Sequence, residues 1–183
     1  MTAPQLALLL FLSWGTPQAS PPVNPNAQLQ KELMDRVAKY VELRKSVEAK
    51  LPPLPDRAEP KVITQHQQAL LASLQRARSD ARQGDIFRDR TRHLIRRLLA
   101  GALSQGSAPR QAMREENPGT IPVRINGPYP TSLPLPTVPP QVLLALPRLP
   151  DEELEYRFVG RRLLLLDSRA NMVIDYMDRA LPH

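Results

Sequence analysis

The sequence contains no cysteine. This absence excludes disulfide bonds, thiol chemistry, thiolate metal sites and a lipid-anchoring cysteine. Aromatic residues are also scarce: they make up 4% of the 183 residues, whereas hydrophobic residues of all kinds make up 42%. We therefore expect a core of aliphatic side chains that is held together by packing alone.

Long hydrophobic runs are rare, and the most pronounced one lies near the N-terminus. Leu6–Leu12 is almost entirely apolar, and the small residues of Thr16–Ser20 follow it. The run is far shorter than the roughly 18–20 residues that span a bilayer, so it predicts a cleaved secretory signal peptide over residues 1–19. The absence of Lys and Arg before the run departs from the usual pattern, and a buried N-terminal helix is the alternative. Export predicts a periplasmic or extracellular protein with no transmembrane span after signal cleavage.

Acidic residues are outnumbered by basic ones. The chain has 18 Asp and Glu against 25 Lys and Arg, which gives a net charge of +7. This bias favours anionic partners, such as an acidic envelope protein or a polyanion, although arginine-rich codon usage in a GC-rich genome would also produce it. Nucleic acid is disfavoured as a partner, because no basic run carries the interleaved aromatics on which single-strand binders stack bases.

The first half of the chain has the periodicity of amphipathic helices. A proline-rich spacer over residues 20–27 precedes helices expected over about 27–50, 60–83 and 86–103. Prolines at 52, 53 and 55 end the first helix, and Gly84 separates the other two. The short connection at Gly84 predicts an antiparallel helical hairpin, and the first helix completes a three-helix bundle over residues 28–103.

After a linker over residues 104–119, the sequence pattern changes from helical periodicity to the alternation that is typical of strands. Alternating apolar residues predict short strands over 121–125, 154–159, 163–166 and 172–174, with a short helix over 141–146. Gly160-Arg161 resembles a two-residue hairpin turn. Residues 120–183 are thus expected to form a small antiparallel β-meander with proline-rich loops, packed on the helices as one domain. The fold class is α+β.

Three stretches together resemble a known group of proteins: Leu51–Pro55, Gly84–Phe87 and Glu155–Arg161, the last with the leucine strand that follows it. They are similar to segments of uncharacterised exported proteins from environmental bacteria with high-GC genomes. The resemblance implies a bacterial envelope setting. It implies no activity, ligand or functional residue, because none is assigned to that group.

Patterns that carry catalytic chemistry are missing. His66 and His93 lie on the second and third predicted helices, but the hairpin would hold them about 13 Å apart, too far to share one zinc ion. Gly101–Ser107 has the glycine spacing of a phosphate-binding loop but lacks its lysine. The chain has no Gly-x-Ser-x-Gly nucleophile elbow. We assign no catalytic, cofactor-binding or metal-binding residue.

The most regular pattern of polar residues in the sequence is formed by arginines. Arg88, Arg92 and Arg96 recur at i, i+4 and i+8 and would form one ridge on the third predicted helix. Like charges at this spacing repel each other, and the arginine fork suits carboxylates and phosphates, so the ridge is our candidate partner-binding site. The alternative is an ordinary solvated face with salt bridges to the first helix, for example to Glu42 or Glu48.

These observations favour a non-enzymatic exported protein that binds an acidic partner. One alternative is an envelope hydrolase whose carboxylates are gathered only by the fold, in a pocket where at least two of them converge. Another is a structural component of an envelope assembly, with Leu163–Leu166 as an edge strand open to β-addition.

Overall fold

The computed structural model describes residues 24–104, 106, 108, 111–112, 121–130 and 138–182. The predicted signal peptide, the first part of the spacer and most of the predicted linker lie outside these residues. The described chain mixes helices with one three-stranded antiparallel sheet. Its elements are α1 (Pro25–Glu48), α2 (Pro60–Ala77), α3 (Asp89–Leu103), α5 (Pro140–Ala145), β1 (Leu154–Val159), β2 (Arg162–Asp167) and β3 (Met172–Met177). None of these helices is long and apolar enough to cross a membrane.

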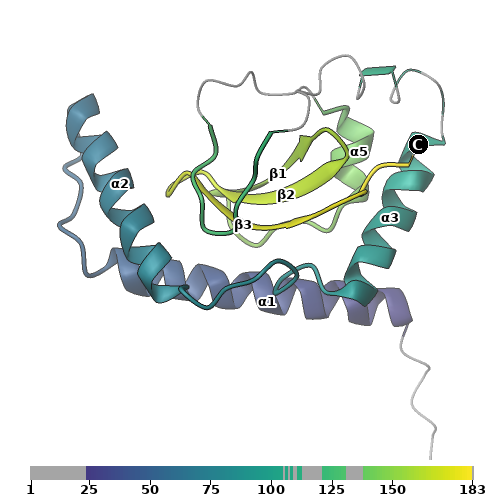
Figure 1. Ribbon diagram of the computed structural model, residues 1–183, viewed down its shortest axis with the longest axis horizontal. Coiled ribbons are helices and arrows are strands. Elements are labelled where there is room, and N and C mark those ends of the chain that lie inside the picture. The colour runs from purple at the N-terminus through teal and green to yellow at the C-terminus, as the bar shows by residue number, and fades with distance from the viewer. Residues whose placement is uncertain are drawn as a thin grey trace, which may run out of the picture.

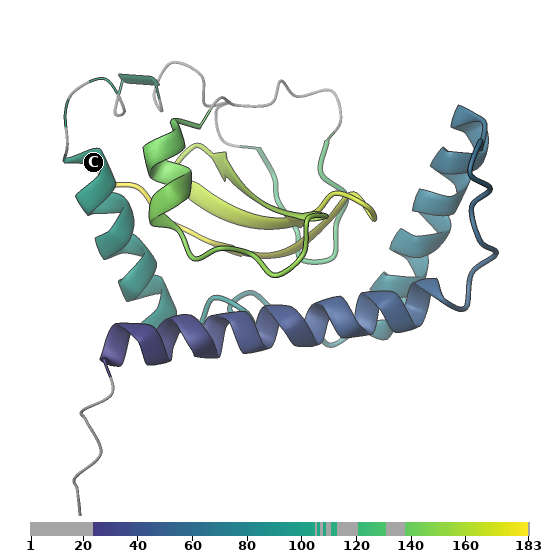
Figure 2. The same cartoon turned by 180° about the vertical axis from the view of Figure 1, so that it is seen from behind.

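The helices form a cradle around the sheet. The long helix α1 runs beneath the sheet, α2 rises from one end of α1, and α3 rises from the other (Figures 1 and 2). The predicted three-helix bundle is therefore wrong, because α2 and α3 each pack on α1 and stand apart from each other. The reason is that α2 ends at Ala77, well before Gly84, and α3 begins only at Asp89. The chain between them runs as an irregular segment along α1 (Figure 1).

Helix α1 begins earlier than the sequence pattern suggested. The Asn24 side chain accepts a hydrogen bond from the Asn26 backbone N–H at 2.9 Å, and Pro25 occupies the first turn, where a missing N–H costs nothing. The last residues of the predicted spacer are thus helical. One side of α1 is buried along its whole length by residues at helical spacing: Leu29, Leu33, Val37, Tyr40, Val41, Arg44 and Val47.

The sheet follows the order of the chain, β1-β2-β3, with both pairs antiparallel. Val159 pairs with Arg162, so Gly160 and Arg161 form the two-residue turn, and the φ of +56° at Gly160 explains why glycine stands there. The leucine strand β2 lies in the centre of the sheet, with a partner on each side. The hypothesis that this strand is an open edge is therefore wrong.

A bulge in β3 decides which side chains face the helices. Leu165 pairs with Asp175 and Leu166 pairs with Val173, so Ile174 is an extra residue on β3. Strict alternation would put Asp175 on the same face as Val173. Because of the bulge, the Asp175 side chain instead reaches the segment between α2 and α3, where backbone N–H groups bind it.

Residues 121–130 lie beside β3 but do not form the strand expected over 121–125. The Asn126 N–H binds the Val173 carbonyl at 2.8 Å and the Tyr129 N–H binds the Asn171 carbonyl at 3.2 Å, with one bridge between Pro128 and Met172. Prolines at 122, 128 and 130 have no N–H to donate, which prevents a regular ladder.

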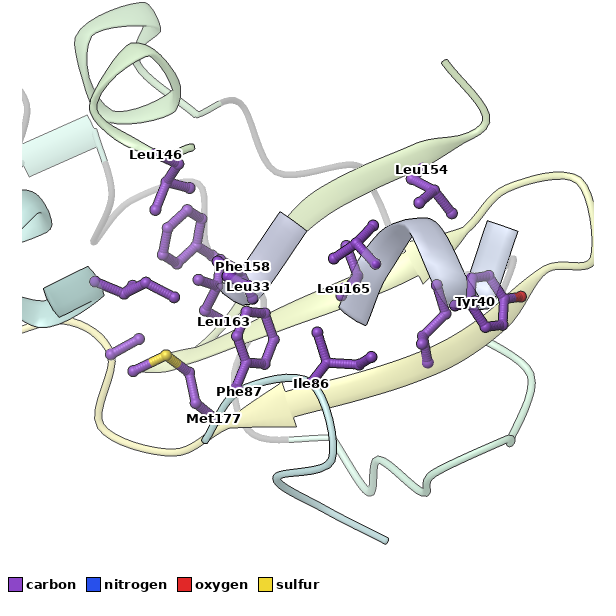
Figure 3. Close-up of a cluster of buried hydrophobic side chains, with 14 of the residues drawn as sticks. Leu33, Tyr40, Ile86, Phe87, Leu146, Leu154, Phe158, Leu163, Leu165 and Met177 are labelled. Carbon is purple, nitrogen blue, oxygen red and sulfur yellow. The ribbon is translucent and has the colours of Figure 1, made fainter. Parts of the chain in front are cut away.

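The core lies mainly between α1 and the sheet. Figure 3 shows Leu33 and Tyr40 of α1 facing Leu163 and Leu165 of β2, with Phe87 beside them. Helical and sheet residues belong to one buried cluster, which α5 closes through Val142 and Leu146. A smaller cluster on the opposite face of the sheet contains Tyr129, Val159, Leu164, Leu166 and Val173. Most members of both clusters are aliphatic.

Candidate partner-binding site

In the structure, the three arginines of the predicted ridge make different contacts. Arg88 is exposed and stands immediately before α3. The Arg92 side chain is 25% exposed; its Nε donates to the Phe87 carbonyl at 2.6 Å, and its Nη1 lies 3.3 Å from Asp89. Arg92 therefore fixes the start of α3, and the three guanidinium groups do not form one free ridge.

Arg96 ties α3 to the C-terminal tail. Its Nε donates to the carbonyl of Arg179 at 3.0 Å, and its Nη2 donates to the carbonyl of Asp178 at 3.1 Å. Both acceptors are neutral backbone oxygens, so the positive charge of Arg96 is not cancelled by these contacts. Arg96 holds the tail and keeps its charge at the same time.

A pocket of about 390 Å³ opens at this junction. Three arginines from different parts of the chain line it: Arg96 from α3, Arg161 from the β1–β2 turn and Arg179 from the tail. Arg161 donates from Nε and Nη2 to the Leu181 carbonyl, at 3.1 and 2.9 Å. The other described residues of the lining are apolar: Ala100, Ala180, Leu181 and Pro182.

Arg179 adopts an unusual backbone conformation. Its φ is +52°, in the left-handed region that costs most residues other than glycine roughly 1–2 kcal/mol. The residue is exposed, and within the described chain its side chain has no hydrogen bond or ion pair, although it interacts electrostatically with the neighbouring Asp178. Nothing in the sequence alone pointed to Arg161 or Arg179, because the fold brings them to Arg96 from distant positions.

The surface of α3 carries a clear excess of positive charge. Arg90 and Arg97 are exposed there, and Arg97 donates to the Asn26 side chain at 2.9 Å. Among the five arginines between residues 88 and 97, Arg92 alone forms an ion pair within the described part of the chain. Within the described chain, no salt bridge joins α3 to Glu42 or Glu48 of the first helix, and Glu48 pairs with Arg169 at 2.5 Å.

The fold also gathers carboxylates, as a hydrolase would require, but it buries them. Arg44 in α1 lies 2.7 Å from Asp151 and 3.7 Å from Asp167. The Tyr40 hydroxyl donates to Asp167 at 2.5 Å, and the Ala170 N–H donates to it at 3.0 Å. Burial raises the pKa of Asp167, and these hydrogen bonds with the nearby Arg44 charge lower it in part. Asp167 is fully buried, so it cannot touch a substrate in this conformation.

Asp175 is also a buried carboxylate that is bound by groups of the fold. It accepts hydrogen bonds from the backbone N–H groups of Gly84, Ile86 and Phe87 at 2.8–2.9 Å. Burial raises the pKa of this carboxyl group, and the backbone donors oppose the rise. The contacts fasten the segment between α2 and α3 to the sheet and leave Asp175 fully buried.

One open pocket, of about 580 Å³, contains two acidic residues, Asp151 and Glu152. The Asp151 carboxylate is already engaged by Arg44 and by the Glu153 N–H, at 2.7 and 3.0 Å. Glu152 is an exposed turn residue beside it. The pocket therefore holds one carboxylate that the fold already uses and one that is exposed to solvent.

The two described histidines, His66 and His93, lie on different helices. His66 lies on α2 and its Nε2 is 3.6 Å from Glu48, whereas His93 is exposed on α3. The helical hairpin that would have held His66 and His93 about 13 Å apart is not formed. Among the residues that the structure describes, no group of three or more histidine, aspartate or glutamate side chains could hold a metal ion.

No protein-family model, curated protein or solved structure matches this chain. The resemblance to exported bacterial proteins stays a prediction from the sequence.

Proposed function

We propose that this chain is an exported bacterial binding protein without catalytic activity, which holds an acidic partner on a basic surface. The surface, called here the α3 basic surface, consists of Arg88, Arg90, Arg96 and Arg97 together with Arg179 of the tail. It keeps Arg96 and Arg88 of the sequence-based candidate site. Arg92 is left out because its side chain supports the start of α3.

The observation that carries this proposal is that four arginines of the surface lack an acidic ion-pair partner. Arg88, Arg90, Arg96 and Arg97 have no ion pair within the described chain, although acidic residues are available elsewhere on the protein. Guanidinium groups without an ion-pair partner create a positive potential that attracts and orients an acidic surface. An acidic envelope protein fits this field, and an envelope polyanion would be attracted by the same charges.

The hydrolase alternative has weaker support. Asp167 and Asp175, the two carboxylates whose pKa is raised by burial, are fully enclosed and bound by groups of the fold. Raised carboxyl pKa values often mark catalytic acids, but such groups must reach the substrate. The assembly alternative loses its main argument, because the leucine strand is central in the sheet.

The test is in-cell cross-linking of the tagged mature chain in its native envelope, followed by mass spectrometry of the captured proteins. The test variant is Arg88→Glu/Arg90→Glu/Arg97→Glu, which leaves Arg92 and Arg96 to support the fold. Lys50→Glu/Arg57→Glu/Lys61→Glu is the matched control, since it changes the net charge equally at exposed positions at the other end of the molecule.

We expect an acidic partner that the wild-type chain and the control retain and the test variant loses. Equal retention by both variants would contradict the α3 basic surface as the binding site. Failure of the wild-type chain to capture any acidic partner would contradict the proposed function.

A further inference from the structure

We infer that the pocket between α3 and the C-terminal tail is where a carboxylate of the acidic partner is bound, with Arg96 and Arg179 as its ligands. This inference rests on the proposed function and names the group that the partner inserts. The pocket lies at the end of the α3 basic surface, and among the described residues three arginines and no acidic side chain line it. Its volume of about 390 Å³ falls within the range of small-ligand sites.

The two guanidinium groups are suited to this task in different ways. Arg96 is held in place by its bonds to the Asp178 and Arg179 carbonyls, which use two of the five N–H donors of its guanidinium group. The remaining donors have no partner within the described chain. An arginine that is fixed before binding loses little conformational freedom when a carboxylate arrives.

Arg179 is held close to Arg96 by the backbone, because Arg96 binds the carbonyl of Arg179 itself. The left-handed φ of +52° at Arg179 is a conformation that glycine or asparagine would adopt more readily, so an arginine here is unfavourable for the fold alone. Strained conformations of this kind are concentrated at ligand-binding and active sites. A role of the Arg179 side chain in binding accounts for it.

The apolar lining distinguishes between anions. Ala100, Leu181 and Pro182 form part of the wall. A phosphate dianion loses more hydration than a single carboxylate when it is brought against apolar carbon. A glutamate or aspartate side chain carries one charge and its own methylene carbons, which can lie on these residues, so an acidic peptide segment is the ligand that matches the pocket.

The test is calorimetric titration of the whole mature chain with a short oligoglutamate peptide, acetylated and amidated at its ends, and with the corresponding oligoglutamine peptide. Arg179→Gln removes the positive charge. It keeps part of the aliphatic side chain, and glutamine must adopt the same left-handed backbone conformation as arginine. Arg57→Gln is the matched control, because Arg57 is exposed between α1 and α2 and belongs neither to the pocket nor to the α3 basic surface. The Nε–H signal of Arg96 in ¹H–¹⁵N spectra reports where the peptide binds.

We expect oligoglutamate to bind in preference to oligoglutamine, with an affinity that falls about tenfold in Arg179→Gln and stays unchanged in Arg57→Gln. The Arg96 Nε–H signal should shift during the titration of the wild-type chain. If Arg179→Gln and Arg57→Gln bind equally well, the pocket is not the site, although the proposed function stands. If the chain does not distinguish the two peptides, both the pocket and the proposed function are contradicted.

Discussion

Tyr40 donates a 2.5 Å hydrogen bond to Asp167 and so joins the middle of α1 to the end of β2 across the core. Both partners are buried, and Arg44 one turn further along α1 contacts the same carboxylate. This contact fixes where the sheet sits on α1. The position of the tail and its pocket depends in turn on the position of the sheet.

Tyr40→Phe should destabilise the protein more at neutral pH than in acid. Burial raises the folded-state pKa of Asp167, so this carboxyl group favours folding when it is protonated, and that contribution is lost as the pH rises through the folded pKa. Removal of the hydroxyl raises the pKa further and deprives the ionised form of a donor. We expect a loss of about 2 kcal/mol at pH 7 and about 1 kcal/mol at pH 4, measured by urea denaturation.

Tyr176→Phe is the control for this prediction, since Tyr176 lies on the other face of the sheet among the smaller cluster. Its effect should be small and the same at both pH values. A loss of stability in Tyr40→Phe that does not depend on pH would show that the hydroxyl does not act through the charge of Asp167.

Arg44→Met should be among the most damaging substitutions on α1. The Arg44 side chain is 4% exposed and lies between Asp151 and Asp167, so its removal leaves buried carboxylates without their cation. The expected loss in the free energy of unfolding is about 3–5 kcal/mol. Lys31→Met, which breaks the exposed pair with Asp35, should cost no more than about 0.5 kcal/mol. Similar losses in the two variants, measured by chemical denaturation, would be inconsistent with a structural role for the buried pair.

Asp175→Asn should release the segment between α2 and α3. The amide has one acceptor oxygen where the carboxylate has two, and its NH₂ group would face backbone N–H groups that now donate to Asp175. We expect a loss of about 2–3 kcal/mol and faster amide hydrogen exchange at Gly84, Ile86 and Phe87. Asp35→Asn, at an exposed position on α1, is the control. Unchanged exchange at these three amides would refute the assigned anchoring role.

Arg96→Gln should loosen the tail without unfolding the protein. The substitution removes the bonds to the Asp178 and Arg179 carbonyls, which are partly exposed to solvent, so a loss of only about 1 kcal/mol is expected. Hydrogen exchange at the amides of residues 178–181 should become faster. Arg90→Gln should leave both quantities unchanged; the same tail exchange in the two variants would mean that Arg96 does not hold the tail.

The hairpin of β1 and β2 could be predicted because its signals are local. The alternation over residues 154–159 and the glycine at 160 lie within one short stretch, and strand pairing follows from the turn. The helices α1 and α3 were similarly found near their expected places. Their arrangement was not, because the segment between α2 and α3 is held by Asp175, which lies far away in the sequence.

The candidate site could be predicted only in part for the same reason. Helical spacing identified Arg88, Arg92 and Arg96 as a group, but spacing contains no information on what each guanidinium contacts. The sequence does not indicate that backbone carbonyls accept hydrogen bonds from Arg92 and Arg96. The pocket combines three arginines from α3, a hairpin turn and the tail, so it exists only in the folded chain.

The most direct test of the central claim is the affinity of the wild-type chain for oligoglutamate as a function of salt concentration, compared with that of Arg88→Glu/Arg90→Glu/Arg97→Glu. If the α3 basic surface holds an acidic partner, the wild-type affinity should be highest at low salt and fall steadily as salt screens the charges, and the variant should bind weakly throughout. An affinity that is independent of salt, or equal in the variant, would contradict the account.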